Sequence, residues 1–244
     1  RGIRCAVGVK VEDLSVGGGG VKAKLTGGAA VQADRVLVAT GRRPDTAEVG
    51  LETVGLTTDR GFIRVDDTMA TSAAGVYCIG DANGRCLLAH AASAHGVVAV
   101  ENALGHRRAF TDPVPWCVYT FPEIAGVGLT QRQAKQAGLP VAVGSFPLSY
   151  LGKALAVGES EGFVKVLRHR GTGELLGVHM MGHNVTECIA AAAALLRRKV
   201  SVRDVAETVF AHPTIGEAFK EAAEDALGAA LHLPPRKVLR VKAE

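Results

Sequence analysis

A histidine near the carboxy-terminal end of the sequence has the residue type that acid–base chemistry requires. His212 opens the run His-Pro-Thr-Ile-Gly-Glu-Ala at 212–218. An imidazole exchanges protons near neutral pH, because its ordinary pKa lies close to that range. By residue type alone, however, a histidine before a proline is an ordinary loop residue. Glu217 also has two interpretations, since Thr214 and Glu217 have the spacing of a helix-capping box.

A second candidate lies where a short apolar run ends. Asp81 follows Gly80 directly after the run 75–79, and a glycine there lets the backbone approach a ligand closely. By type alone, an aspartate in this position closes a tight turn. The glycines at 17–20 are a poorer candidate for a phosphate site, because the residues after them alternate as in a strand. A dinucleotide-binding loop must lead into a helix instead.

The amino-terminal half has the patterns of strands and one long helix. Apolar residues alternate on both sides of the glycines at 17–20, which predicts a hairpin. The apolar runs 35–41 and 75–79 predict short strands buried in a parallel sheet. A helix is expected over about 87–104, with Gly105 as its stop signal.

The second half has the pattern of a compact α+β domain behind a linker. Pro113 and Pro115 resist both a helix and a central strand, so we place a domain boundary there. Capping boxes predict where helices start, and apolar runs predict strands between them. The helices are expected from Thr130 to Gly138, from Asn184 to about Lys199, briefly after Ser201, and from Thr214 to about Leu231, and the strands near 141–146, 162–168 and 175–181.

Composition excludes several classes of protein. The 244 residues are 48% hydrophobic and 21% charged, which is typical of a globular chain with a sizeable core. A net charge of +4 without basic runs interleaved with aromatics favours no nucleic-acid partner. The longest apolar run, 188–196, is about half of the ~18 residues that a membrane span needs. We expect a cytoplasmic protein with no membrane association.

The cysteines and the basic end of the chain also fit a cytoplasmic protein. The five cysteines are scattered and show no CxxC spacing, which argues against a disulfide framework or a metal site and fits a reducing cytosol. A solvated end is expected for the basic tail, which carries Arg236, Lys237, Arg240 and Lys242.

Several segments match one known family when their order and spacing are taken together. They are Val-Leu-Val-Ala-Thr-Gly-Arg-Arg-Pro-Asp (36–45), Gly-Val-Tyr-Cys-Ile-Gly-Asp (75–81), Leu-Leu-Ala-His (87–90) and His-Pro-Thr-Ile-Gly-Glu-Ala (212–218), joined by 121–130 and 161–166. Over about Arg1–Ala230, the sequence resembles the pyridine-nucleotide disulfide oxidoreductases and, within them, the dihydrolipoamide dehydrogenases.

The resemblance implies the fold and the domain organisation. The fold class is an α/β remnant of a nucleotide-binding FAD/NAD domain followed by an α+β carboxy-terminal dimerisation domain. The implied parts are the end of the nicotinamide-binding domain at 1–41, a central segment that contacts FAD at 42–112, the interface domain at 113–235 and a tail at 236–244. On the family's plan, both GxGxxG loops and the redox-active cysteine pair lie outside this sequence. We therefore expect the fragment alone to be inactive.

The resemblance also implies roles for single residues. His212 would lie at the dimer interface and take a proton from a dithiol in the partner subunit's active site, with Glu217 accepting its second ring N–H. Asp81 would accept a hydrogen bond from a ribityl hydroxyl of FAD, and the N–H of Ala89 would donate to the flavin ring. Contacts with the dinucleotide cofactors are implied for Gly80, Asp81, Leu88, Ala89, Ala39, Thr40 and Gly41.

The implied reaction is dithiol oxidation, with electrons passing through a cysteine disulfide and FAD to NAD. Residues 113–235 would form a homodimer, and a lipoamide-bearing acyltransferase complex is a further candidate partner. The sequence ends Leu-Arg-Val-Lys-Ala-Glu, without the carboxy-terminal thiol or selenol of mercuric and high-molecular-weight thioredoxin reductases. A glutathione-reductase-like enzyme and a non-catalytic dimerisation module remain alternatives. Phe210 and Ile215-Gly216 depart from the family's usual His and Leu-Ser, which affects the surroundings of His212.

Overall fold

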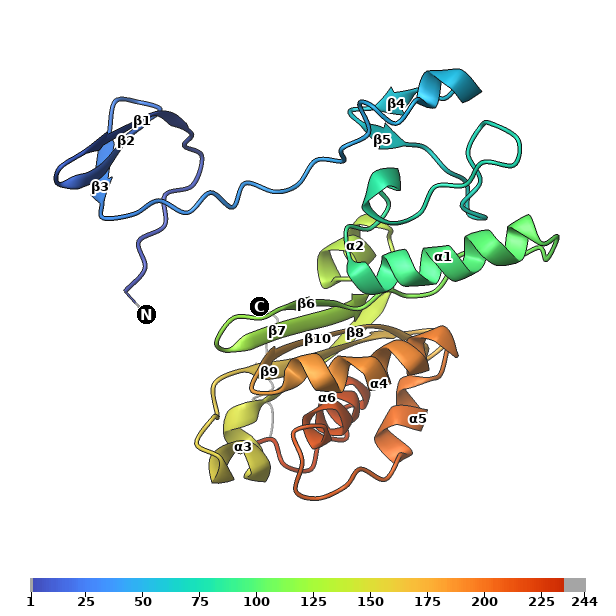
Figure 1. Ribbon diagram of the computed structural model, residues 1–244. Coiled ribbons are helices and arrows are strands. Elements are labelled where there is room, and N and C mark those ends of the chain that lie inside the picture. Colours follow the sequence, from blue (N-terminus) through green and yellow to red (C-terminus); the bar gives the residue numbers. More distant parts are fainter. Residues whose placement is uncertain (1, 235–244) are drawn as a thin grey trace, which may run out of the picture. The chain divides into compact units, whose positions relative to one another are not determined.

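The computed structural model describes residues 2–234, and the chain divides into two compact units between Asp45 and Thr46. Figure 1 shows the elements of both units, which are described here one at a time. Pro235, the last residue of the predicted interface domain, and the predicted tail 236–244 lie outside the described residues.

The first unit contains the predicted hairpin. Strands β1 (Val11–Gly17), β2 (Gly20–Leu25) and β3 (Ala30–Ala33) form an antiparallel sheet in that order. The pair Gly17 and Gly20 closes the β1–β2 turn. The glycines at 17–20 therefore form part of a hairpin, as their sequence context predicts, and do not precede a helix.

The apolar run 35–41 is not a strand, so that prediction is wrong for this chain. Residues 35–45 form neither helix nor strand, and the side chains of Leu37 and Val38 are 89% and 72% exposed. A parallel strand exists only where a neighbouring strand accepts its backbone hydrogen bonds. Within residues 2–234, no strand pairs with this run.

The second unit begins with short elements around one long helix. They are η1 (Leu51–Val54), β4 (Thr58–Asp59), β5 (Phe62–Ile63), η2 (Gly80–Asn83) and α1 (Ala89–Ala103). The predicted helix over 87–104 is confirmed. The predicted strand over 75–79 is wrong, because only Tyr77 pairs there, in an isolated bridge with Ala70. The run leads into the 3₁₀ turn η2 instead.

A five-stranded antiparallel sheet forms the centre of the rest of this unit. Its order is β6-β7-β10-β9-β8, with β6 (Trp116–Val118), β7 (Glu123–Gly128), β8 (Val141–Pro147), β9 (Phe163–His169) and β10 (Leu175–Gly182). The three predicted strands correspond to β8, β9 and β10 and are confirmed. Strands β6 and β7 were not among the predicted elements, because the two prolines before β6 and the glycines in β7 interrupt their apolar pattern.

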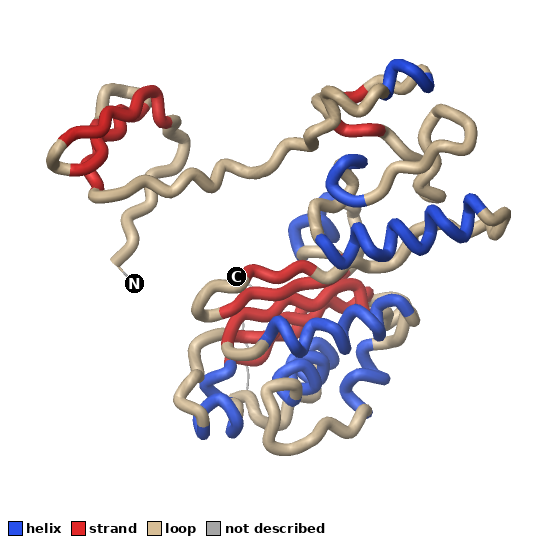
Figure 2. The backbone as a smooth tube through the Cα atoms, viewed as in Figure 1, coloured by secondary structure: helices blue, strands red, loops and turns tan. Residues whose placement is uncertain are grey.

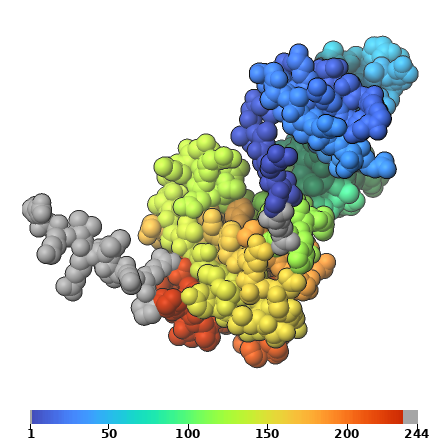
Figure 3. All heavy atoms as spheres, turned by 90° about the vertical axis from the view of Figure 1, so that its left-hand side faces the viewer, coloured from blue at the N-terminus to red at the C-terminus, as the bar shows by residue number. Residues whose placement is uncertain are grey.

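Helices cover one face of this sheet (Figures 1 and 2). They are α4 (Val185–Arg197), α5 (Val202–Glu207) and α6 (Glu217–Leu227), with α2 (Gln131–Gln136), η3 (Leu148–Tyr150) and α3 (Gly152–Ala156) in the connections. The main core lies between the sheet and these helices, where Phe146, Val166 and Phe219 are buried. In the space-filling view of Figure 3, the yellow, orange and red segments of this region pack into one continuous body.

Helix α6 lies unusually close to strand β8, and a glycine allows it. A Cβ atom placed on Gly144 would lie 2.0 Å from the backbone oxygen of Ala222 in α6. The missing side chain at this position lets the helix backbone approach the sheet directly. This close approach sets the distance of α6 from the sheet and therefore helps to position Glu217 at the start of the helix.

Two of the four predicted caps have the expected geometry. Thr130 and Ser201 each form a complete capping box, in which the hydroxyl accepts from the backbone N–H three residues later. Asn184 precedes α4 in a left-handed conformation (φ 55°) but makes no side-chain cap. Thr214 does not cap α6, because Gly216 is the N-cap and the Thr214 hydroxyl donates to the Ala211 carbonyl (2.8 Å).

The cysteines and the helices are relevant to the expectations of no disulfide framework and no membrane span. All five cysteines have free thiols. None of the helices within residues 2–234 combines the length and the apolar character that crossing a membrane requires.

Candidate active site

His212 lies in a loop that packing holds against the helical layer. The loop connects α5 to α6, and the ring of Phe210 meets that of Phe219 edge to face, with centroids 6.3 Å apart. Ile215, on the other side of His212, is buried in the main core. Apolar anchors therefore flank the histidine on both sides, and its position does not depend on a flexible connection.

The imidazole of His212 and the carboxylate of Glu217 form a close pair. Nδ1 of His212 lies 2.9 Å from Oε1 of Glu217, and Oε2 of the same carboxylate accepts the backbone N–H of Thr214 (2.7 Å). The contact with the imidazole and the contact with the Thr214 N–H therefore use different oxygens. Glu217 makes both contacts at once, although the sequence pattern suggests that they compete.

The pair leaves one ring nitrogen available for chemistry. An ionised carboxylate only accepts hydrogen bonds, so Nδ1 is the nitrogen that donates and Nε2 is the proton acceptor. Nε2 makes no hydrogen bond to any residue in 2–234, and the histidine side chain is 77% exposed while that of Glu217 is 21% exposed. A carboxylate in this position stabilises an imidazolium. The arrangement suits a base that takes a proton from a group outside its own chain.

A cavity of about 220 Å³ adjoins this pair, and a second histidine–carboxylate pair lines it. Nδ1 of His232 lies 2.6 Å from Oε1 of Glu221, one helical turn after Glu217. The hydrogen bond and the negative charge of Glu221 raise the pKa of His232. Sequence reasoning missed this pair, although the four-residue spacing of Glu217 and Glu221 places both carboxylates on one face of α6.

The second set of predicted site residues surrounds η2 and the start of α1. Gly80 has a left-handed φ of 65°, and a Cβ there would lie 3.1 Å from the Cβ of Ala92 in α1. The N–H of Gly80 donates to Nδ1 of the fully buried His95 (3.3 Å). Burial lowers the pKa of His95, which favours the neutral ring that this contact needs. These contacts hold the turn that carries Asp81 against α1.

Polar groups at this turn fit the polar groups of a flavin nucleotide. Asp81 is exposed, and its carboxylate can accept a hydrogen bond from a sugar-type hydroxyl. Ala89 is the first residue of α1, and Leu88 supplies no side-chain cap. The N–H of Ala89 thus has no acceptor within the helix and can donate to a ring carbonyl. A carboxylate acceptor and a close glycine therefore lie at the start of η2, and a backbone donor lies at the start of α1.

The remaining predicted cofactor residues lie in the first unit. Ala39, Thr40 and Gly41 are exposed and belong to the stretch without helix or strand. Their assignment to a dinucleotide stays a prediction. Within residues 2–234, no hydrogen bond or ion pair joins His212 to Asp81 or to Ala89, so the second unit contains two separate candidate sites.

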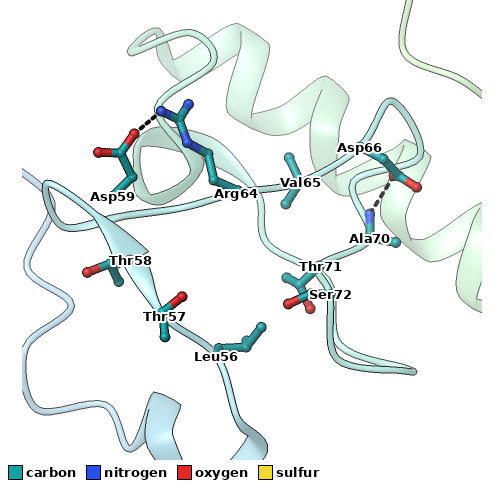
Figure 4. A pocket seen from close by; sticks show the side chains of 10 residues that line it. All are labelled: Leu56, Thr57, Thr58, Asp59, Arg64, Val65, Asp66, Ala70, Thr71 and Ser72. Carbon is teal, nitrogen blue, oxygen red and sulfur yellow. Dashed lines mark hydrogen bonds and ion pairs between the residues drawn. The ribbon is translucent and has the colours of Figure 1, made fainter.

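A larger cavity, of about 480 Å³, includes none of the predicted site residues (Figure 4). Its charged groups have partners within the same segment: Asp59 pairs with Arg64, and Asp66 accepts the backbone N–H groups of Thr68 (2.8 Å) and Ala70 (3.1 Å). These contacts stabilise the local turns and leave no charged group of the cavity without a partner. We assign no site here.

Two family models match the chain. The pyridine nucleotide-disulphide oxidoreductase model matches residues 1–96, and the model of that family's dimerisation domain matches residues 114–223. The chain belongs to the pyridine nucleotide-disulphide oxidoreductase family. The resemblance, the mixed α/β fold and the dimerisation domain expected from the sequence are thereby confirmed.

Two curated relatives of the chain are dihydrolipoyl dehydrogenases. The chain is 38% identical over 239 residues to a dihydrolipoyl dehydrogenase of Chlamydia muridarum, covering 97% of the chain and 51% of that protein. It is 48% identical over 201 residues to a dihydrolipoyl dehydrogenase of Thermus scotoductus, covering 82% of the chain and 44% of that protein. The chain thus spans about half the length of the curated relatives it matches.

Solved structures agree with the family. LpdA from Mycobacterium tuberculosis matches with a TM-score of 0.83 and 30% identity, over 88% of this chain and 48% of that one. The flavoprotein disulfide reductase RclA from Escherichia coli matches with a TM-score of 0.81 and 23% identity, over 88% of this chain and 50% of that one. The likeness to RclA concerns the fold alone.

Proposed function

We propose that this chain is the carboxy-terminal portion of a dihydrolipoyl dehydrogenase, which oxidises a dithiol and passes the electrons through FAD to NAD. The names of the relatives and their identities of 38% and 48% support the substrate class. The observation that carries the proposal is the His212–Glu217 pair, with Nδ1 and Oε1 2.9 Å apart and the imidazole 77% exposed.

In this proposal, His212 moves the proton of the dithiol. Nε2 accepts the proton as the thiol becomes a thiolate, and Oε1 of Glu217 stabilises the imidazolium that results. The Thr214 N–H holds the other carboxylate oxygen, which keeps Glu217 aligned while the histidine changes charge. FAD, when bound, supplies the two-electron acceptor between the dithiol–disulfide centre and the nicotinamide.

The residues at η2 and α1 would hold the flavin. Asp81 would accept a hydrogen bond from a ribityl hydroxyl, and the N–H of Ala89 would donate to a carbonyl of the ring. The amino-terminal end of α1 favours the negative charge of a reduced flavin. Leu88 and Gly80 shape the same surface, and Ala39–Gly41 would close the nicotinamide domain near the dinucleotides.

The exposure of His212 fits an active site that two subunits share. A base that faces away from its own subunit can serve a dithiol bound to the partner subunit. We place the homodimer contact in residues 113–235, which include the matched dimerisation model at 114–223. A lipoamide-bearing acyltransferase complex would supply the dithiol substrate.

The substrate preference of the full-length protein tests this proposal. We expect reduction of NAD by dihydrolipoamide, and little oxidation of NADPH by glutathione disulfide, measured as the two kcat/KM values. A preference for glutathione disulfide would favour the glutathione-reductase-like alternative. A protein without flavin and without either activity would favour a dimerisation module.

A further inference from the structure

Strand β9 places a guanidinium group on the face of the sheet that the helices cover. Val164 and Val166 are buried in the main core, at 1% and 0% exposure, and Arg168 follows them at the same two-residue spacing. Successive side chains of a strand alternate between its faces, so Arg168 points to the same side as the two valines. Its register partner Ala142 lies on β8, two residues before Gly144, which faces α6.

This guanidinium has no counter-charge in the part of the chain that the structure describes. Nε of Arg168 is fully buried and makes no hydrogen bond within residues 2–234, and no ion pair of this side chain is present there either. The residue as a whole is half-buried, so solvent reaches part of it while its Nε donor is shielded. A buried donor without an acceptor is unfavourable, and an anion beside this positively charged group would supply the acceptor.

A cavity of about 200 Å³ opens beside Arg168 and has the lining that an anion needs. Its lining includes a second arginine and the hydroxyl of Thr172, whereas the Ser201 hydroxyl already donates to Asp204 (2.8 Å). No acidic residue is among the lining residues, which are Arg168, Gly171, Thr172, Gly173, Ser201, Arg203 and Leu227. Arg203 is 71% exposed and contacts Glu207 at a long 3.4 Å, so its guanidinium can turn towards the cavity. The hydroxyl of Thr172 accepts the N–H of Glu174 (3.3 Å) and keeps its own hydrogen to donate.

We propose that this cavity at the β9–β10 turn binds a small tetrahedral oxyanion of the phosphate class. Arg168 supplies a fixed donor from the sheet, Arg203 supplies a movable one from α5, and the Thr172 hydroxyl donates from the turn. Guanidinium groups match phosphate oxygens with paired, charge-assisted hydrogen bonds. The site involves neither His212 nor the residues at η2, so it is independent of the proposed function.

The test measures binding of inorganic phosphate to the purified full-length protein by calorimetry, at constant ionic strength set with sodium chloride. We expect one phosphate per subunit and a rise in unfolding temperature with phosphate concentration. Arg203→Gln should weaken binding roughly tenfold or more, because a hydrogen bond to a charged group is lost. Arg170→Gln is the matched control, because the Arg170 Nε donates to the Val141 carbonyl (2.9 Å) and does not line the cavity.

A second variant keeps the inference falsifiable if phosphate binds weakly. Arg168→Met retains the length of the side chain and removes the charge, so it should abolish the response to phosphate. Without phosphate, this variant should unfold at a temperature equal to or above that of the wild type, because a buried donor without an acceptor has been removed. A phosphate response that Arg168→Met preserves, or a wild type whose unfolding temperature follows sodium chloride and phosphate equally, would overturn the inference. A phosphate monoester and acetate, titrated separately, show whether the site prefers tetrahedral oxyanions to carboxylates, and a preference for acetate would also contradict it.

Discussion

Replacing His212 by glutamine removes proton transfer and changes little else. The side chain is 77% exposed, and its one hydrogen bond within residues 2–234 is to Glu217, which keeps its second contact, with the Thr214 N–H. Exposed substitutions of this kind usually change folding stability by less than about 0.5 kcal/mol. The effect should therefore appear in catalysis and not in the amount of folded protein.

The expected loss follows from the role that the geometry gives to Nε2. A positioned acid–base group contributes roughly 10²–10⁴-fold to a rate, which corresponds to about 3–5 kcal/mol of transition-state stabilisation. We expect kcat/KM of the full-length enzyme for dihydrolipoamide, with NAD in excess, to fall by that factor in His212→Gln. Flavin content, measured by absorbance, and dimer formation, measured by sedimentation, should stay at wild-type levels.

His106→Gln is the matched control, because His106 is an exposed histidine outside both candidate sites. This variant should keep wild-type turnover. If His212→Gln also keeps near-normal turnover, then His212 is an ordinary loop residue and the assignment of the base is wrong. If His212→Gln loses flavin or dimer together with activity, then the histidine has a structural role that the described contacts do not explain.

Three further predictions follow from contacts around α6. Glu217→Gln should lower turnover less than His212→Gln does, because the amide oxygen still accepts a hydrogen bond but no longer stabilises an imidazolium; the same steady-state assay decides this. The pKa of His232 is raised by its hydrogen bond to Glu221 and by the charge of that carboxylate. The stabilisation from this pair should therefore be fully present below the unfolded-state pKa of about 6.5 and lost as pH rises through the higher folded-state value. His232→Gln should flatten that part of the profile of unfolding temperature against pH, and a profile identical to the wild type would exclude the pair as a source of stability. Gly144→Ala should destabilise the fold by roughly 1–3 kcal/mol, because the added Cβ would lie 2.0 Å from a backbone oxygen of α6. Denaturant unfolding measures this, and a free energy within error of the wild type would mean that α6 can move away from the sheet.

Local patterns were sufficient to predict the elements whose hydrogen bonds close within a few residues. The Thr130 and Ser201 caps join a hydroxyl to an N–H three residues away, so sequence alone defines them. The helix over 87–104 likewise satisfies its own backbone. Thr214 failed as a cap because its hydroxyl bonds back to Ala211, a competition that spacing does not reveal.

Strand predictions depended on partners that a local pattern does not contain. The runs 35–41 and 75–79 have the composition of buried parallel strands, yet no described strand pairs along either of them, and both lack strand structure. Runs 141–146, 162–168 and 175–181 form strands because each has an antiparallel neighbour in the same unit. Composition can favour a strand, but the strand forms only where a neighbouring strand is available to pair with it.

The two histidine–carboxylate pairs also depend on contacts that a local sequence pattern does not contain. The spacing of His212 and Glu217 crosses a loop, so helical geometry did not predict their contact, and the family resemblance supplied it. The pair of His232 and Glu221 joins residues eleven positions apart across the end of α6. The sequence did contain a signal for this pair. Acidic residues of α6 lie among its buried alanines, and a buried carboxylate needs a partner.

Hybrid dimers show whether His212 serves the active site of the partner subunit. One full-length subunit carries His212→Gln, the other carries serine in place of both disulfide-forming cysteines, and each homodimer should be inactive. In a hybrid, the intact cysteines of one subunit meet the intact His212 of the other. The purified hybrid should therefore recover about half of the wild-type turnover per dimer, since one of its two symmetric sites is complete. A hybrid as inactive as its two parents would contradict this assignment, because the intact cysteines share a subunit with the His212→Gln change, and His212 would have to act within its own subunit.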